Sequence, residues 1–256
     1  MIPAALGIDV GSTTCKAVAI DADGRILARA VEPLDPRIDP QVARLIADVA
    51  AGAGPEVPLG ATGYGRKRVR AGRAVTEITC HARGAFARTG RPGVLVDMGG
   101  QDTKVIRVGP AGEVLDFAMN DKCAAGTGRF LEVILGRLRV PFPEVGALAG
   151  GDAVAVTVSS TCTVFAESEV ISLVAAGAPT GGIVKGLHQA LASRVAALSR
   201  AVTAGASEVF LSGGVALNAA MGAALEEALA RPVRVVPEPQ LVGALGAALC
   251  VLPRIG

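Results

Sequence analysis

The feature that most constrains the fold of this chain is an internal repeat. With a shift of 88 residues, DVGSTTCK at residues 9–16 falls on DMGGQDTK at residues 97–104, so that Asp, Gly and Lys coincide at three places. The match continues from GRIL at residues 24–27 to GEVL at residues 112–115, where we predict a Gly-centred hairpin turn in both copies. The chain is therefore predicted to contain two related halves.

The hydrophobic pattern predicts alternating strands and helices within this repeat. In the first half we expect strands at 6–10, 15–21, 26–31 and near Leu59, and helices at 41–51, near Arg66 and at 77–88. In the second half we expect strands at 94–98, 104–108, 114–119, 208–211 and 233–236, and helices at 126–140, 164–176, 183–203, 216–230 and 241–252. This order is typical of an α/β protein with mixed sheets. We expect one domain at 1–90 and a second at 91–256, with the last helix, at about 241–256, free to pack back on the first.

The first turn, at residues 9–16, has the composition of a phosphate-binding loop. Its backbone N–H groups and hydroxyls can wrap phosphate oxygens, and Lys16 adds a point charge. The strands place Asp9 and Asp97 at corresponding ends of two related sheets, where their carboxylates can face one cleft and hold hydrated magnesium. A lone D-x-G-S-T is often only a hairpin, but the duplication favours phosphate, and no G-x-x-x-x-G-K-[ST] is present to indicate a P-loop. The nucleotide contacts expected from the two turns are Gly11, Ser12, Thr13, Thr14, Cys15, Lys16, Gly99, Gly100 and Lys104.

A third element, SGGVALN at residues 212–218, follows a predicted strand and opens a predicted helix. Its backbone offers a flat surface for a nucleotide base, and Gly213, Gly214 and Asn218 are the candidate contacts. Gly126 and Gly128 resemble half of a dinucleotide-binding fingerprint, but they follow a cysteine and not a clean strand. We reject that second interpretation.

Two D-x-G strands with a GG-x-x-x-N loop resemble the acetate and sugar kinase, heat-shock chaperone and actin superfamily. This resemblance covers nearly the whole chain and implies two ribonuclease-H-like domains of the actin-like ATPase type, with a nucleotide cleft between them. Eight ordered motifs together resemble the activators of 2-hydroxyacyl-CoA dehydratases, which group with the ATPase subunits of benzoyl-CoA reductases. They are DVGSTTCK, TGYGR, TEITCHARGA, DMGGQDTK, NDKCAAGTGRFLE, TCTVFAESEVISL, SGGVALN and PEPQLVGALGAA.

Two of these motifs place a cysteine just before a predicted helix, Cys123 in one and Cys162 in the other. From the residues alone, a buried core thiol is an equally good interpretation of each. The resemblance implies that both are ligands of a 4Fe-4S cluster. Such a cluster needs four thiolates as a rule, and a two-fold homodimer would supply them. A helix N-terminus would favour the negative charge by roughly 0.3 to 1 kcal/mol.

The resemblance also implies how the cluster works. A ferredoxin or flavodoxin reduces it, and ATP binding and hydrolysis then drive one electron onto a partner dehydratase, which eliminates water from a 2-hydroxyacyl-CoA by a radical route. In this scheme Gln101 is the candidate for positioning the attacking water, and Glu132 could accept hydrogen bonds from the ribose of ATP or ADP. Gln240 is either a nucleotide contact or a polar helix cap.

Three other functions compete with this one. A benzoyl-CoA reductase ATPase subunit is the nearest, and one chain cannot separate it from a dehydratase activator. A small-molecule kinase would use the same cleft, but we find no surplus segment for a substrate pocket and base. An actin-like or chaperone-like ATPase would leave the paired cysteines unexplained.

Composition excludes several partners. With 51% hydrophobic and 19% charged residues the chain is globular, and its five scattered cysteines do not form a secreted disulfide framework. The net charge of +2 and the 3% of aromatic residues argue against nucleic acid. The apolar run at 241–253 is shorter than the about 20 residues that span a bilayer, and the N-terminus lacks the basic region of a signal peptide. We expect a cytoplasmic protein without a membrane partner.

Several other polar and thiol residues are most simply interpreted as structural or surface residues. Cys15, Cys80 and Cys250 are expected to be buried core thiols, and His188 a surface or packing residue. The basic run RKRVR at residues 66–70, with Arg73, is either a solvated face or a docking site for an acidic electron donor or partner enzyme.

Overall fold

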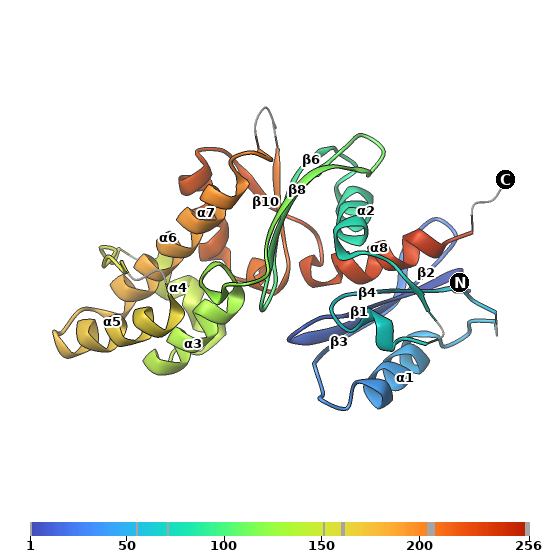
Figure 1. The fold of residues 1–256 in the computed structure, drawn as a ribbon, viewed down its shortest axis with the longest axis horizontal. Helices are drawn as coiled ribbons and strands as arrows, with labels where there is room; N and C mark the ends of the chain where they lie inside the picture. Colours follow the sequence, from blue (N-terminus) through green and yellow to red (C-terminus); the bar gives the residue numbers. More distant parts are fainter. Residues whose placement is uncertain are drawn as a thin grey trace. The chain divides into compact units, whose positions relative to one another are not determined.

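The computed structural model describes residues 2–54, 56–70, 72–150, 152–159, 162–203 and 208–253 (Figure 1). The chain divides into two compact units. Unit 1 comprises Met1–Pro92, Ile106–Asp116 and Val236–Gly256, and unit 2 comprises Gly93–Val105 and Phe117–Val235. Thr161 and Ser160, which belong to the second predicted cysteine segment, lie outside the described residues.

Unit 1 is built on a five-stranded mixed sheet with the order β3-β2-β1-β4-β5. Its central strand β1 pairs antiparallel with β2 and parallel with β4. The strands are β1 (Ala5–Val10), β2 (Thr14–Ile20), β3 (Ile26–Pro33), β4 (Leu59–Thr62) and β5 (Arg73–Ala74). The helical segments are α1 (Ile38–Val49), η1 (Arg66–Arg68), α2 (Glu77–Thr89), η5 (Pro239–Leu241) and α8 (Val242–Val251).

Strand alternation sends the two faces of this sheet to different helices. Ile8 and Val10 of β1 join a buried cluster with Leu45 of α1. Val18 and Ile20 of β2 instead join a cluster formed with α8. Helix α8 packs on β1 and β4, and α2 packs against α8. The last helix of the chain is therefore part of the core of unit 1.

The second sheet has the order β10-β9-β6-β7-β8, with β9 parallel to both β6 and β10. Its strands are β6 (Gly93–Met98), β7 (Thr103–Val108), β8 (Val114–Asn120), β9 (Val209–Ser212) and β10 (Val233–Val235). The α-helices of unit 2 are α3 (Gly128–Leu138), α4 (Val145–Gly150), α5 (Thr163–Ala175), α6 (Thr180–Ser199) and α7 (Ala219–Leu229). Its short 3₁₀ turns are η2 (Ala124–Gly126), η3 (Phe142–Glu144) and η4 (Gly214–Leu217).

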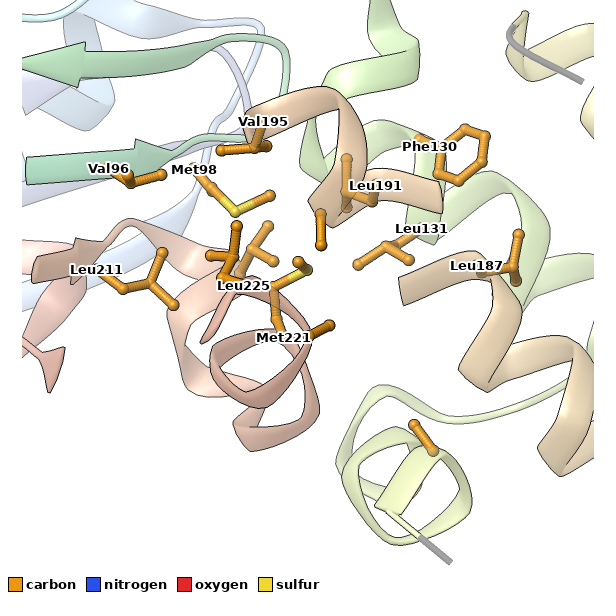
Figure 2. Packing of buried hydrophobic residues seen from close by; sticks show 14 of the residues in the cluster. Val96, Met98, Phe130, Leu131, Leu187, Leu191, Val195, Leu211, Met221 and Leu225 are labelled. Atoms are coloured by element: carbon orange, nitrogen blue, oxygen red, sulfur yellow. The ribbon is translucent and has the colours of Figure 1, made fainter. Parts of the chain in front are cut away.

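The core of unit 2 lies between this sheet and its helices. Figure 2 shows Met98 of β6 and Leu211 of β9 beside Leu225 of α7, with Leu191 of α6 and Leu131 of α3 completing the cluster. These side chains are at most 1% exposed. Burial of a Leu or Met side chain stabilises a fold by roughly 1.5–3 kcal/mol, so this cluster fixes α3, α6 and α7 on the sheet.

The predicted repeat is confirmed by backbone hydrogen bonds at equivalent positions. Gly11 N donates to Thr14 O at 3.1 Å in the first turn, and Gly99 N donates to Asp102 O at 3.0 Å in the second. The later hairpins match as well, with Gly24 N bonded to Asp21 O at 3.1 Å and Gly112 N bonded to Gly109 O at 3.0 Å. Both halves therefore start from the same local chain path.

Most predicted elements are observed, but several boundaries move. The predicted helix at 126–140 is a 3₁₀ turn followed by α3, and that at 216–230 is η4 followed by α7. The helix expected near Arg66 is a single 3₁₀ turn. The structure adds α4, a short Gly- and Ala-rich helix whose sequence carries little periodic signal, and the two-residue strand β5. The α/β class with two mixed sheets is confirmed.

None of the helices in the described part of the chain is both long and apolar enough to cross a lipid bilayer.

Candidate functional site

The first candidate element is the turn between β1 and β2 in unit 1. Asp9 and Lys16 are opposite each other across the antiparallel pair, and Lys16 Nζ lies 3.2 Å from Asp9 Oδ2. Strand β4 brings Thr62 beside Asp9, and Gly63 follows with a φ of +88°. A Cβ at Gly63 would also collide with the Asp9 carboxylate. Only glycine tolerates both this positive φ and this close contact. Gly63 therefore allows the chain to pass close to the Asp9 carboxylate.

The second element, in unit 2, repeats this arrangement at Asp97. Lys104 Nζ lies 3.5 Å from Asp97 Oδ2 and 2.6 Å from Asp102 Oδ2. Strand β9 brings Ser212 beside Asp97, and its hydroxyl donates to Asp97 Oδ1 at 2.7 Å. Gly213 follows with a φ of +90°, as Gly63 does in the first unit. The network is shielded from water, because the Lys104 and Asp97 side chains are only 3% and 5% exposed.

The start of helix α3 is hydrogen-bonded to this second turn. Gly128 N donates to Gly99 O at 2.9 Å, and Arg129 N donates to Gly100 O at 2.8 Å. Thr103 Oγ1 donates to Gly126 O at 2.6 Å. The first N–H groups of a helix lack partners inside the helix. Here two of them are satisfied by carbonyls of the Gly-Gly turn, so the turn and the helix must move together.

Cys123 lies in the short segment between β8 and η2, shortly before the start of α3. Its N–H donates to Asn120 Oδ1 at 3.2 Å, and Asn120 Nδ2 donates back to Cys123 O at 2.8 Å. Arg194 of α6 donates to Ala125 O at 3.0 Å, and its guanidinium lies 4.7 Å from the centre of the Phe130 ring. Burial lowers the pKa of Arg194, and the Cys123 side chain raises it. Asn120 therefore holds both the N–H and the carbonyl of Cys123, while the thiol itself is exposed.

Cys162 occupies the N-cap position of helix α5, without a capping hydrogen bond from its side chain, and is also exposed. Only Ala166 and Val170 of this helix are buried. Val164 and Phe165 are 66% and 69% exposed, which leaves a large apolar surface directly after the cysteine. The geometry confirms that Cys162 is at a helix entrance. Cys123 instead precedes the 3₁₀ turn η2, five residues before α3 begins.

The other predicted nucleotide contacts occupy several environments. Asn218 is buried, where its side chain caps α7 by accepting from Ala220 N at 3.1 Å and lies 2.6 Å from His188 Nε2. Glu132 is exposed and forms an ion pair with Arg129 at 3.0 Å. The residues that remain partly accessible are Gly11, Ser12, Thr13, Thr14, Lys16, Gly99, Gly100, Gly213, Gly214 and Gln240, and Gln101 is exposed.

The structure also shows the environments of His188, of the basic run at residues 66–70 and of the three remaining cysteines. His188 is 1% exposed, so it is a packing residue and not a surface residue. Arg68 forms two hydrogen bonds of 2.9 Å with Asp39, and Arg66 lies 3.5 Å from Glu77, so part of the basic run is engaged within unit 1. Cys250 is only partly buried, unlike Cys15 and Cys80.

A model of the BadF/BadG/BcrA/BcrD ATPase family matches residues 6–251 of the chain. The chain belongs to this family. It is 43% identical over 249 residues to the activator of lactoyl-CoA dehydratase from Anaerotignum propionicum, with 95% of each chain covered. Component A of the (R)-2-hydroxyglutaryl-CoA dehydratase of Acidaminococcus fermentans is 40% identical, with a TM-score of 0.91 and 97% of each chain covered.

A second solved structure that is similar to this chain contains bound ADPNP. The activator of the 2-hydroxyisocaproyl-CoA dehydratase from Clostridium difficile with bound ADPNP is 37% identical, with a TM-score of 0.88 over 97% of this chain and 94% of that one. More distant structures, under 25% identical and including a glucokinase, match over nearly the whole chain and show the fold alone. The fold is that of the actin-like ATPases.

The contacts of two residues, Ser212 and Arg194, could not be predicted from the sequence. Ser212 was placed in the third element, but its bond to Asp97 depends on a parallel pairing of strands that lie 115 residues apart. Arg194 carries no local signal, because it follows Ser193 in a long helix of ordinary composition. The pattern A-S-R in a helix predicts only a solvated cation. Both contacts are products of the tertiary fold.

The cysteines of this chain differ in burial, and therefore in whether they are accessible to a ligand. Burial, followed by the nearby Asp9 carboxylate, raises the pKa of Cys15 to about 12, so this residue is a neutral thiol inside β2. Cys123 and Cys162 are instead exposed. Among the described residues no group of three or more His, Cys, Asp and Glu side chains could hold a metal ion.

Proposed function

We propose that this chain is an ATP-hydrolysing activator of a 2-hydroxyacyl-CoA dehydratase. In this proposal it delivers one electron from a 4Fe-4S cluster that two copies of the chain hold together. Membership of an ATPase family and the similarity to two dehydratase activators over nearly the whole chain support the reaction and the partner. A ferredoxin or flavodoxin supplies the electron, and the protein works in the cytoplasm.

One observation carries the coupling step of the proposal. The carbonyls of Gly99 and Gly100 accept the first N–H groups of α3, and Thr103 of the same turn bonds the carbonyl of Gly126. The segment between Cys123 and α3 is thus tied to the turn that would contact phosphate. A shift of this turn during hydrolysis is transmitted through these hydrogen bonds to η2 and α3, and from η2 along the backbone to Cys123. No contact between the two units is needed for this step.

The proposal assigns a role to each part of the two turns. Lys16 and the backbone of Gly11 to Thr14 bind phosphate oxygens, as hydroxyls and N–H groups of tight turns do. Asp9 and Asp97 hold Mg²⁺ through water, and Lys104 fixes the Asp97 carboxylate. Gln101, which is an exposed residue of the second turn, positions the attacking water.

The remaining contacts serve the nucleoside. Gly213 and Gly214 present backbone to the base, and Gln240 is a further contact. Glu132 binds the ribose after leaving Arg129. Asn218 acts indirectly in this scheme, because its side chain caps α7 and is held by His188. It therefore shapes the loop rather than touching the ligand.

The cluster site requires a homodimer. Cys123 and Cys162 of each copy supply the four thiolates, and the cluster, when bound, stores the single electron. The exposed apolar side chains of α5, Val164, Phe165 and Ile171, support this assignment, because they follow Cys162 and a second copy would cover them. Cys123 keeps its position through Asn120 and through the contact of Arg194 with the neighbouring carbonyl.

The alternatives are less well supported. A benzoyl-CoA reductase ATPase subunit would use the same residues, and the similar proteins described above favour the dehydratase. A small-molecule kinase needs a substrate pocket and a base for its acceptor hydroxyl. The described residues offer two exposed thiols at the entrances of helical segments, which a kinase does not require.

The proposal is tested by activation of a purified 2-hydroxyacyl-CoA dehydratase under anaerobic conditions, with ATP and a reduced ferredoxin. We expect the dehydratase to become active only with this protein and only with ATP. The Cys123→Ser/Cys162→Ser variant should fail to activate while still binding ADP, and the matched Cys250→Ser variant should activate normally. Activation by the double variant, or activation without ATP, would overturn the proposal.

A further inference from the structure

The helices α2 and α8 of unit 1 bring a second pair of cysteines together. A Cβ at Gly246 of α8 would collide with the Cys80 carbonyl oxygen, and one at Gly84 of α2 would collide with the Val242 carbonyl oxygen. The two backbones therefore touch without side chains between them. Cys250 follows Gly246 by one helical turn, on the helix that contacts the Cys80 backbone, and each of the two thiols influences the pKa of the other.

We propose that Cys80 and Cys250 are a modification site, a dithiol that reacts with hydroperoxides and closes to a disulfide between α2 and α8. A disulfide requires Cα atoms roughly 4.4–6.8 Å apart, and helices whose backbones touch bring Cα atoms of facing residues this close. The proposal goes beyond the proposed function, because it involves neither the nucleotide residues nor Cys123 and Cys162.

The two thiols have different electrostatic surroundings. The neighbouring Cys80 thiol, opposed by burial and assisted by the positive charges of Arg83 and Arg73, lowers the pKa of Cys250 below its usual range. The Cys250 thiol together with burial raises the pKa of Cys80 above its usual range. Cys250, which lies near two arginines, is therefore the thiol that ionises more easily, and Cys80 is its buried partner. Cys250 is also the more accessible of the two, since Cys80 is fully buried. A thiolate that is partly accessible and lies beside cations is the form of cysteine that reacts with oxidants.

The reaction balances in two steps. The Cys250 thiolate attacks one oxygen of hydrogen peroxide, the O–O bond breaks, and Cys250 becomes a sulfenic acid while hydroxide leaves. The Cys80 sulfur then attacks the Cys250 sulfur, the S–O bond breaks, and the Cys80 proton leaves with the hydroxyl group as water. Two electrons pass from the two sulfurs to the two peroxide oxygens. A thiol reductant reverses the change by exchange.

The test uses the Cys123→Ser/Cys162→Ser variant, so that the exposed thiols cannot react. This variant keeps three of the five cysteines. After treatment with stoichiometric hydrogen peroxide and acid quenching, thiol titration in denaturant should find one remaining thiol, Cys15. Mass spectrometry of the digest should show residue 80 linked to residue 250, and dithiothreitol should restore all three thiols.

Two further variants in the same background assign the roles. Cys80→Ser should stop at a Cys250 sulfenic acid that dimedone labels, and Cys250→Ser should keep both of its remaining thiols. Three unreacted thiols in the parent variant, or a link that includes Cys15, would refute the proposal. Wild-type protein with the same peptide mapping serves if the double variant does not fold. Because the readout is a covalent link, the result stands whether or not the protein activates a dehydratase.

Discussion

The two Asp turns have the same backbone but different side-chain networks. Both place a lysine against the aspartate, at 3.2 Å for Lys16 and Asp9 and at 3.5 Å for Lys104 and Asp97. In the second turn Asp102 adds a second carboxylate at 2.6 Å from Lys104. The parallel neighbour of each aspartate also differs in what it does. Ser212 donates to Asp97, whereas Thr62 donates to the Val75 carbonyl.

This difference teaches how a duplicated turn can take on two tasks. Lys104 is 3% exposed between two carboxylates, so its charge is used within the protein, and the group keeps one negative charge for a cation. Lys16 is 14% exposed and balances a single carboxylate. The first turn can therefore offer its lysine to an anion. The second is expected to hold its shape and to transmit movement to α3.

The largest expected effect tests whether both turns serve the same nucleotide. Asp9→Asn and Asp97→Asn should each lower kcat for ATP hydrolysis by about 10²–10³-fold, the range for loss of one electrostatic contact in an active site. Asp23→Asn, in an exposed hairpin, is the control and should leave turnover unchanged. Steady-state release of phosphate measures all three. Normal turnover by either Asp9→Asn or Asp97→Asn would show that the two turns do not serve the same nucleotide.

The second prediction concerns stability. Lys104→Met leaves the buried Asp97 carboxylate without its cation and should lower the free energy of unfolding by about 3–5 kcal/mol. Lys16→Met removes a more exposed partner and should cost about 1.5–3 kcal/mol. Urea unfolding of both variants, followed by circular dichroism, measures the difference. A larger loss for Lys16→Met would reverse the assignment of the structural role.

A smaller effect separates the two parallel neighbours. Ser212→Ala removes a hydrogen bond to a buried carboxylate and should cost about 1.5–3 kcal/mol, the range for bonds to charged groups. Thr62→Val removes a bond between neutral groups and should cost about 0.5–1.5 kcal/mol. Thermal unfolding midpoints compare the pair directly. Equal midpoints would mean that the Ser212 hydroxyl contributes no more than its counterpart.

The smallest effect lies at alkaline pH. Cys15 and Thr103 occupy equivalent positions, and burial raises the pKa of Cys15 from 9.0 to about 12 in the folded chain. Its contribution to stability is thus fully present below pH 9 and is lost as the pH rises from 9 toward 12. Cys15→Thr, which copies the second turn, should lose less stability than the wild type between pH 8 and 10. Parallel slopes of the urea midpoint against pH would contradict this assignment.

The fold was largely predictable because its signals are local and occur twice. A Gly turn between two apolar strands predicts a hairpin from a few residues, and the second copy at Asp97 supports the first at Asp9. Boundaries failed where glycine and alanine blur the helical period, as in α4, or where a 3₁₀ turn precedes a helix, as at η2 and η4.

The network around the site could not be predicted from sequence. The bond from Ser212 to Asp97 requires the register of parallel strands, and that between Asn218 and His188 requires two helices to meet. Cys80 and Cys250 are adjacent because glycines let α2 and α8 touch, a contact across 170 residues. Periodicity places each of these residues on an element, and only packing selects its partner.

The most direct test of the central claim is the iron content of the protein purified without oxygen, together with its visible spectrum and its mass in solution. We predict a coloured dimer with about four iron atoms, as one 4Fe-4S cluster requires. Cys123→Ser and Cys162→Ser should each lose the iron, and Cys15→Thr should retain it. A colourless, iron-free dimer that still hydrolyses ATP would contradict the account.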